Sequence, residues 1–262
     1  RWDVLDAFAD AAVQAGVPRT TDFNAGDNEG VGYFDVNQKA GWRWNTAKAF
    51  LRPVLKRPNL TVWTEAQVEK LIVATDEDGA KVCKGAKVRR AGSVVDVEAR
   101  KELILSAGAI GSPTILQLSG IGPAQHLKET GIDVVADLPG VGENLQDHLQ
   151  IRSVFKVKGV KTLNKLANSL FGKMMIGLEY GLLRSGPMSM SPSQLGAFTR
   201  SDDSQSHANL EYHVQPLSLD AFGEPLHRDP AFTASVCNLN PTSTGSVKVR
   251  SADANDAPAI AP

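Results

Sequence analysis

The chain has 262 residues, and its 28 Lys and Arg against 29 Asp and Glu give a formal net charge of −1 at neutral pH. That length is ample for one large core or two smaller ones, and 42% hydrophobic with 22% charged residues is typical of an ordinary globular protein. The balanced charge removes the electrostatic case for a nucleic-acid partner or an anionic membrane surface. Two cysteines are too few for a disulfide framework or a Cys-rich zinc site.

No segment of the sequence predicts a membrane span or a secretory signal. The best candidate for a span, Leu170 to Leu183, contains Lys173 and Glu179 and falls well short of the required ~20 apolar residues. Residues 1–16 are acidic and alanine-rich, whereas a signal peptide has a basic end followed by an apolar run. These features favour the cytoplasm as the location of this chain.

The first fifty residues predict two helices separated by a long loop. Apolar residues at helical spacing indicate a helix over 3–15, which Gly16 and Pro18 close. Residues 20–44 are rich in Gly, Asn and Asp and show no clear period, so we expect an irregular loop. Tyr33, Trp42 and Trp44 within it favour a loop that packs or covers a site. Asn45 then caps a short helix that ends before a proline.

Strand patterns dominate the region that follows. Alternating or β-rich runs, separated by glycine-containing turns, occur at residues 60–63, 68–74, 81–88 and 94–98. We interpret the last three as a small antiparallel meander. Residues 103–105 differ, because they form a short and wholly apolar run, which is typical of a parallel strand buried on both faces.

The most informative stretch is a small-residue turn at 106–111. Ser112-Pro113 then predicts the start of a helix, and a further strand is expected over 132–135. Strand, small turn, helix and strand form the βα unit of a doubly wound sheet. Ligands bind such sheets at the carboxyl ends of strands, where Ala107 and Gly108 lie. Small residues there allow a cofactor to approach the backbone, although tight strand–helix packing explains them nearly as well.

Beyond residue 150 the pattern changes to an α+β arrangement. Residues 163–183 are mostly helical, and 186–193 form a loop rich in Pro, Met and Ser. Strands are predicted at 210–214, 232–239 and 246–250, of which the last alternates clearly.

No set of residues in the sequence indicates a catalytic or metal centre. The dinucleotide fingerprint G-x-G-x-x-G is absent, and neither cysteine has an activating context. His126 is expected on the solvated surface, and His207 and His213 lack the spacing and carboxylate neighbours of a metal site. Asp147 could orient His148 as a base, but adjacent side chains usually point apart, so we favour a structural hydrogen-bonding role for His148.

One motif is long and specific. Residues 108–122 resemble the second signature of the glucose–methanol–choline (GMC) family of flavin oxidoreductases. Other segments are similar to pieces of that family in the right order, at residues 41–47, 57–60, 138–148 and 241–247. The resemblance covers essentially the whole chain, and its character is closest to bacterial choline-dehydrogenase-like members.

The resemblance implies an FAD-dependent oxidoreductase that transfers a hydride from a small-molecule alcohol to the flavin. The implied fold class is α/β, with part of a doubly wound FAD-binding sheet and its β-meander, and part of an α+β substrate domain with an antiparallel sheet. The implied divisions are a segment bordering the substrate domain, the middle of the FAD domain, and part of the substrate domain, at 1–45, 46–150 and 151–262. By the same resemblance, the backbone of Val68 holds the adenine, and Ala107 and Gly108 lie near the cofactor.

The departures from the family pattern define a further expectation. The family's glycine-rich FAD fingerprint lies upstream of this sequence and its catalytic histidine pair lies downstream, so no catalytic residue is assigned. The chain, which starts at Arg1, is expected to be an internal fragment that cannot oxidise an alcohol alone. A non-catalytic scaffold with the same fold is the alternative, and an NAD(P)-type enzyme is disfavoured by the missing fingerprint.

The alcohol, the electron acceptor and the oligomeric state stay open. Choline would require an aromatic cage or a carboxylate, because a quaternary ammonium binds through cation–π contact and charge. Trp42, Trp44, Tyr212 and Glu211 are available in principle, although packing is the favoured role for the aromatic residues.

Overall fold

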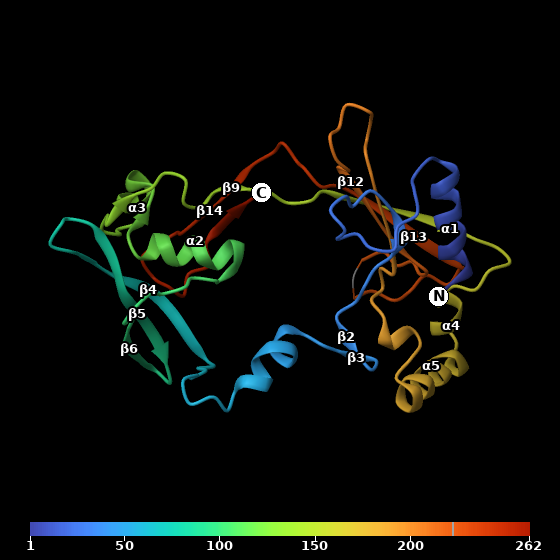
Figure 1. Cartoon of the computed structure of the whole chain (residues 1–262), viewed down its shortest axis with the longest axis horizontal. Coiled ribbons are helices and arrows are strands. Elements are labelled where there is room, and N and C mark those ends of the chain that lie inside the picture. Colours follow the sequence, from blue (N-terminus) through green and yellow to red (C-terminus); the bar gives the residue numbers. More distant parts are fainter. Residues whose placement is uncertain (222) are drawn as a thin grey trace. The chain divides into compact units, whose positions relative to one another are not determined.

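The computed structural model describes residues 1–221 and 223–262, which pack into two compact units. The first unit comprises Arg1–Leu60 and His148–Asn240, and the second comprises Thr61–Asp147 and Pro241–Pro262 (Figure 1). Each unit is therefore assembled from segments that lie far apart in the sequence.

This division differs from the boundaries expected from the sequence, which were 1–45, 46–150 and 151–262. Residues 46–60 belong to the first unit, and residues 241–262 belong to the second. The second difference arises because β14 (Gly245–Lys248) pairs with β9 (Glu143–Leu145). Pairing between strands so distant in the chain leaves no local signal in the sequence.

The first unit is built on a five-stranded antiparallel sheet. In spatial order its strands are β1 (Gly30–Tyr33), β11 (Leu195–Thr199), β12 (Leu210–Gln215), β13 (Ala231–Asn238) and β10 (Gln150–Lys156). The register aligns Leu195, Val214 and Ala234 across three strands, so their side chains share one face of the sheet. The predicted strands at 210–214 and 232–239 are confirmed.

The helix predicted over 3–15 is confirmed as α1 (Asp3–Gln14), and it covers that apolar face. Leu5 and Ala9 are fully buried against Val31 and Leu195. Full burial of a leucine side chain contributes about 2 kcal/mol, so this contact anchors the amino-terminal segment to the sheet. Gly16 follows the helix with a φ of 99°, a conformation that glycine adopts without strain.

The loop expected over 20–44 contains more regular structure than predicted. It holds β1, which joins the main sheet, and the hairpin of β2 (Gln38–Lys39) and β3 (Trp42–Arg43). These strands are too short to leave an alternating pattern in the sequence. A π-helical turn (Ala47–Leu51) and a 3-10 turn (Arg52–Val54) follow.

The helical stretch predicted over 163–183 is two helices, α4 (Leu163–Ala167) and α5 (Leu170–Leu183), and a 3-10 turn (Pro187–Ser189) follows. The break occurs because Ser169 caps α5 by accepting a hydrogen bond from the Gly172 amide at 2.8 Å. Close packing fixes the glycine, since a Cβ at Gly172 would lie 2.0 Å from the Leu166 carbonyl oxygen. No helix in the described part of the chain is long and apolar enough to cross a membrane.

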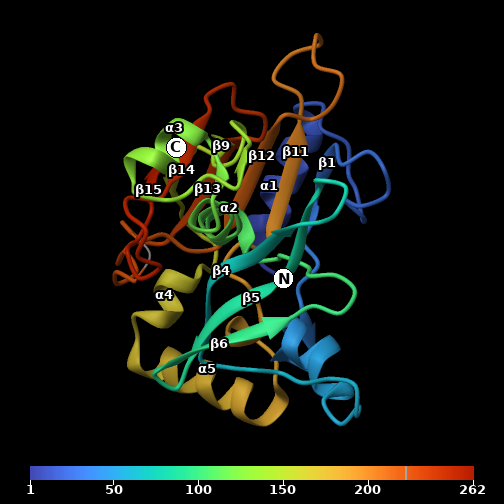
Figure 2. The same ribbon diagram turned by 90° about the vertical axis from the view of Figure 1, so that its left-hand side faces the viewer.

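The second unit contains the predicted meander, whose three strands lie side by side in Figure 2. They are β4 (Ala66–Thr75), β5 (Lys81–Arg90) and β6 (Ser93–Glu98). Gly79 and Gly92 form the turns with φ near 80°, as their sequence signals predict.

The remaining elements of the second unit surround helix α2 (Gly108–Leu118). Strands β7 (Ile121–Gly122) and β8 (Ala136–Asp137) form a short parallel pair, and the short helix α3 (Ala124–Glu129) lies between them in the sequence. In a second small sheet, β14 lies between β9 and β15 (Ala259–Ala261).

The strand expected over 60–63 is absent, and two further local expectations in this unit are wrong. Residues 103–105 form no strand, and Ile104 is 78% exposed, because no neighbouring strand in the described residues pairs with this segment. The strand expected over 132–135 is also absent; the chain pairs only afterwards, through β8. The fold class is nevertheless confirmed as α/β, with helices and mainly antiparallel sheets in both units.

Helix α2 begins at Gly108 rather than at Ser112-Pro113. Ser112 does cap a backbone amide, since its Oγ accepts from the Ala107 N–H at 3.0 Å, but it does so from within the first helical turns. Gly108 has a φ of 80°, so glycine permits the chain to enter the helix four residues earlier than predicted.

Candidate functional site

The face of the five-stranded sheet opposite α1 carries polar side chains. Since side chains alternate along a strand, residues in register lie on the same face. One row across β12, β13 and β10 holds Glu211, Cys237 and Gln150, and the next holds His213, Ser235 and Arg152. We refer to these six residues as the polar sheet face.

A carboxylate–imidazole pair lies within the polar sheet face. Glu211 Oε1 lies 2.6 Å from His213 Nε2, and the two side chains are 15% and 32% exposed. The Gln150 amide lies 3.1 Å from the other ring nitrogen, Nδ1. If the amide donates to Nδ1, the imidazole proton is on Nε2 and is donated to Glu211. Both ring nitrogens are therefore engaged, which fixes the orientation of the ring.

Aromatic packing supports the same imidazole. The Phe34 ring meets the His213 ring edge-on, with centroids 5.8 Å apart. Gly196, in register with His213 on β11, makes room for this phenylalanine, because a Cβ there would lie 2.0 Å from the Phe34 ring. The expectation that His213 lacks a carboxylate neighbour is wrong. The signal was present, since alternate residues of a strand share one face and Glu211 precedes His213 by two positions.

Cys237, Glu211 and His148 form a group of three that could hold a metal ion among the described residues, with ligand atoms within 4.8 Å of one another. Burial raises the pKa of the Cys237 thiol, and the neighbouring Glu211 charge raises it further. The thiol therefore stays protonated, which opposes metal binding because the thiolate is the ligand. His148 also lies 3.2 Å from the Leu239 carbonyl oxygen through Nε2, in agreement with the structural role expected for it.

Two other histidines make contacts that the sequence did not reveal. His126 is half-buried and its Nε2 lies 3.0 Å from the Val249 carbonyl oxygen, so the expected solvated position is wrong. His207 makes side-chain contacts with Ser206 and Asn240.

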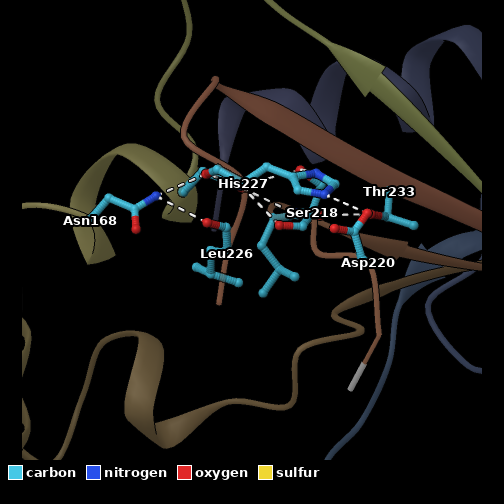
Figure 3. Close-up of polar contacts among 8 residues, drawn as sticks. Asn168, Ser218, Asp220, Leu226, His227 and Thr233 are labelled. Atoms are coloured by element: carbon cyan, nitrogen blue, oxygen red, sulfur yellow. Dashed lines mark hydrogen bonds and ion pairs between the residues drawn. The ribbon is translucent and has the colours of Figure 1, made fainter. Parts of the chain in front are cut away.

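His227 lies between a serine and an aspartate, as Figure 3 shows. Its Nδ1 is 3.0 Å from Ser218 Oγ, and its Nε2 is 3.0 Å from Asp220 Oδ1. The residue types are those of a hydrolytic triad, but Ser218 is fully buried and no substrate can reach its hydroxyl.

The same network fixes helix α4 to the segment between β12 and β13. Asn164 is fully buried and donates to the carbonyl oxygens of Ser218 and His227 at 3.0 and 2.9 Å. Asn168 donates to the His227 carbonyl oxygen as well, at 2.8 Å (Figure 3). The network therefore has a structural role, because the two amides connect α4 and the residue after it to the backbone carbonyls of Ser218 and His227.

In the second unit, Ala107 and Gly108 lie together at the start of α2. Both are exposed, and a Cβ placed at Gly108 would meet no atom within 4 Å. Next to them is a depression of about 380 Å³, lined by residues of α2, of β14, and of β9 with its flanking residues: Ala109, Pro113, Gly142, Glu143, Asn144, Leu145, Gln146 and Val247. A helix that begins with an exposed glycine in this way lets a ligand approach the backbone closely.

Val68 occupies a different part of the second unit. It is a half-buried residue of β4, opposite Val88 of β5, and the register shifts directly after it. Strand β4 meets α2 at the far end of that helix, where the Leu71 amide donates to Ser119 Oγ at 2.7 Å. Ala107 and Gly108 are neighbours at the start of α2. Val68 is separate from them, because it lies on β4, which contacts the other end of α2.

A larger hollow of about 600 Å³ lies beside β4. It is lined by strand residues 69–73, by the end of α2 at 118–120, and by residues 252–254. Its walls mix charges of both signs, since Arg89 donates to Glu69 at 2.6 Å within it.

The fold and these surfaces define a two-unit α/β protein with a β-meander and an antiparallel sheet that is polar on one face. The chain belongs to the GMC oxidoreductase family, whose model matches residues 3–150.

Two curated relatives match nearly the whole chain. The chain is 37% identical to an oxygen-dependent choline dehydrogenase of Brucella ovis over 257 residues, which is 98% of this chain and 46% of the relative. It is 36% identical to an alcohol dehydrogenase (acceptor) of Pseudomonas putida, with the same coverage. The chain therefore spans about half the length of these relatives.

Solved structures show the same fold. Pyridoxine 4-oxidase from Mesorbium loti superposes with a TM-score of 0.79 at 25% identity, covering 98% of this chain and 46% of that one. A formate oxidase variant from Aspergillus oryzae superposes with a TM-score of 0.80 at 24% identity, covering 95% and 47%. The predicted family and fold class are confirmed.

Proposed function

We propose that the chain is part of an FAD-dependent oxidoreductase that acts on the CH–OH group of an alcohol. The observation that carries this proposal is that α2 begins at the exposed Gly108, within the family's long signature at 108–122. FAD, when bound, accepts the hydride from the alcohol carbon, and the chain supplies binding and orientation. The curated relatives, named as choline and alcohol dehydrogenases, support the alcohol as the donor class.

The residues of the second unit fit such a cofactor. Ala107 and Gly108 are exposed and present backbone without an obstructing side chain, as an extended dinucleotide requires. We assign the backbone of Val68 to the adenine on the family resemblance alone. No side chain of a special type is needed at that position, because backbone groups can recognise the ring.

The polar sheet face of the first unit is proposed as part of the substrate wall. Glu211 holds His213 in one orientation, and the ring can hold a proton on Nε2 against the carboxylate. We assign no general base in this chain, since the Gln150 amide contacts the other nitrogen of His213. The complete catalytic set is proposed to include residues that this chain does not carry.

An uncharged alcohol is favoured over choline by the aromatic residues. The Arg184 guanidinium lies 4.3 Å from the Trp42 ring centroid, so the protein's own cation already occupies that ring. Lys39 lies 5.2 Å from the Trp44 ring centroid in the same way. Tyr212 packs with Phe8 of α1, on the apolar side of the sheet. None of the aromatic residues considered for choline is free to hold a quaternary ammonium.

The test uses the protein expressed from its complete gene. We expect purified protein to carry flavin absorbance and, without oxygen, to lose it on addition of a primary alcohol. A Gly108→Val variant should lose FAD, because a β-branched side chain is strained at a φ of 80° and obstructs the approach. Gly79→Val, at a similar φ in the distant meander turn, is the matched control and should keep its FAD.

Each negative result has a defined meaning. Protein that folds but carries no flavin refutes the FAD assignment. Protein that binds FAD but is not reduced by any alcohol supports the non-catalytic scaffold instead. Faster reduction by choline than by uncharged alcohols of the same size contradicts the substrate preference.

A further inference from the structure

One buried glutamine connects the segments that meet beside Gly108. Gln117, in the last turn of α2, is fully buried, although glutamine is mostly an exposed residue type. Burial of a side-chain amide is unfavourable unless its hydrogen bonds are satisfied. Its hydrogen-bond partners among the described residues are backbone groups of Pro113, Val247 and Val249. The buried amide therefore joins α2 to β14 and to the residue after β14.

The side-chain amide of Gln117 acts as a strand partner for β14. Its Nε2 donates to the Val247 carbonyl oxygen at 2.9 Å, and its Oε1 accepts from the Val249 amide at 3.3 Å. In a parallel sheet, a carbonyl and an amide two residues apart on one strand bond to a single peptide residue of the neighbour. The pairing of β14 with β9 ends at Ser246 and Glu143. Gln117 therefore continues the edge of this sheet beyond the end of β9.

Gly142 is packed into the same contact. Its carbonyl oxygen accepts from the Val247 amide at 2.7 Å. A Cβ at Gly142 would lie 2.3 Å from the Val247 carbonyl oxygen and 2.7 Å from Gln117 Nε2, and the φ of Gly142 is 83°. Both the space and the backbone conformation therefore require glycine. We use the name Gln117 contact for Gln117, Gly142 and Val247, which join α2, the residue before β9, and β14.

The Gln117 contact lies behind the depression next to Ala107 and Gly108. Gly142 and Val247 both line that depression. Pro113 lines it as well, and its carbonyl oxygen accepts from Gln117 Nε2 at 3.1 Å. One buried side chain therefore fixes a helix, a loop and a strand at the place where the start of α2 presents its backbone.

We propose that Gln117 is a positioning residue for FAD, acting through Pro113, Gly142 and Val247. This inference rests on the proposed function. The Gln117 amide sets the spacing of α2, the loop and β14, and this spacing decides how closely FAD approaches the backbone of Ala107 and Gly108. A preorganised binding site loses affinity when its supporting contacts are removed, even where every group that touches the ligand is kept.

A purely structural role is the alternative, because a buried amide that bridges two elements also stabilises the fold. The two roles differ in their effect on the cofactor. A structural residue weakens FAD binding only as much as any equally destabilising change in the same unit does. A positioning residue weakens FAD binding beyond that level.

The experiment uses the complete gene product, purified with its flavin. At a temperature where both proteins are folded by circular dichroism, we expect Gln117→Met to release FAD at least roughly tenfold faster than the wild type. The recovery of free-flavin fluorescence measures the release. Ile132→Ala is the matched control, because Ile132 is 7% exposed in the same unit and does not line the depression. The control should lower the Tm but release FAD like the wild type. Equal acceleration in variants of equal Tm overturns the proposal.

Two glycines of one loop provide a second test. Gly142→Ala places a methyl group in the Gln117 contact and should also accelerate the release of FAD. Gly140→Ala is the matched control, because a Cβ at Gly140 would meet no atom within 4 Å, and this variant should keep FAD like the wild type. If Gln117 and Gly142 act through one contact, the double variant should accelerate release by less than the product of the two single effects. A full product, or unchanged release from Gly142→Ala, contradicts the proposal.

Failure of this inference is distinguishable from failure of the proposed function. A wild-type protein that folds without flavin refutes the proposed function and this inference with it. A wild-type protein that carries FAD, together with a Gln117→Met variant that retains FAD equally well, refutes the role of Gln117 alone.

Discussion

Replacement of Gln117 by methionine tests the contact that holds α2 to the last segment of the second unit. Gln117 belongs to the family signature at 108–122, and its side chain is fully buried. Its Nε2 donates to the Val247 carbonyl oxygen at 2.9 Å, and its Oε1 accepts from the Val249 amide at 3.3 Å. Methionine has a similar length and volume but can make neither hydrogen bond.

The expected cost follows from the groups left behind. The Val247 carbonyl and the Val249 amide lose their side-chain partner inside the unit, and Val247 and Val249 are 2% and 4% exposed. An unsatisfied buried backbone group costs about 1–3 kcal/mol, and partial relaxation reduces the sum. We therefore expect Gln117→Met to lower the free energy of unfolding by about 2–4 kcal/mol.

Urea unfolding followed by circular dichroism measures this change. Gln125→Met is the matched control, because Gln125 is exposed and its amide donates to the exposed Glu129; it should change the free energy by less than about 0.5 kcal/mol. Hydrogen exchange of the Val249 amide should accelerate in Gln117→Met and not in the control. A stability within about 1 kcal/mol of the wild type would show that the bridge contributes little and that the reasoning is wrong.

Three further predictions concern the first unit. Burial and, to a smaller extent, the hydrogen bond to Asp6 together raise the pKa of Tyr33 from 10.0 to about 12. The neutral phenol therefore stabilises the fold below pH 10, and this contribution is lost as the pH rises toward 12. Absorbance titration at alkaline pH should show a step near pH 12 that Tyr33→Phe removes, and a step at the ordinary value would contradict the burial. Gly196→Ala should destabilise the protein by about 1–3 kcal/mol in thermal unfolding, because its Cβ would overlap the Phe34 ring; an unchanged Tm would exclude that contact. Iodoacetamide should alkylate Cys237 in the native protein more slowly than Cys83, since burial and Glu211 raise the pKa of Cys237, and reversed rates would refute this order.

The parts of the fold that could be predicted are those with local causes. The meander over 66–98 follows from β-rich runs joined by tight turns, where Gly79 and Gly92 supply the positive φ. Helix α1 follows from its period and its glycine stop. The strand expected at 103–105 failed for the opposite reason, because a buried parallel strand depends on neighbours that the run itself does not specify.

The candidate site divides in the same way. Ala107 and Gly108 could be found because small residues beside a helix start are visible in one short motif. The polar sheet face could not, since it depends on the register of β10, β12 and β13, which come from distant parts of the chain. Only the Glu211–His213 pair had a local signal, because two residues separated by two positions in one predicted strand share a face of the sheet.

The order of segments in the first unit has a consequence for biosynthesis. The apolar side of α1 is made before the strands it covers, and β11 begins about 180 residues after α1 ends (195 − 14 = 181). At about 5–20 residues per second, this helix waits on the order of ten to forty seconds for its partners. During that interval the leucine and phenylalanine side chains of α1 lack the sheet that covers them, so the nascent chain is a natural client for chaperones until β13 has been made.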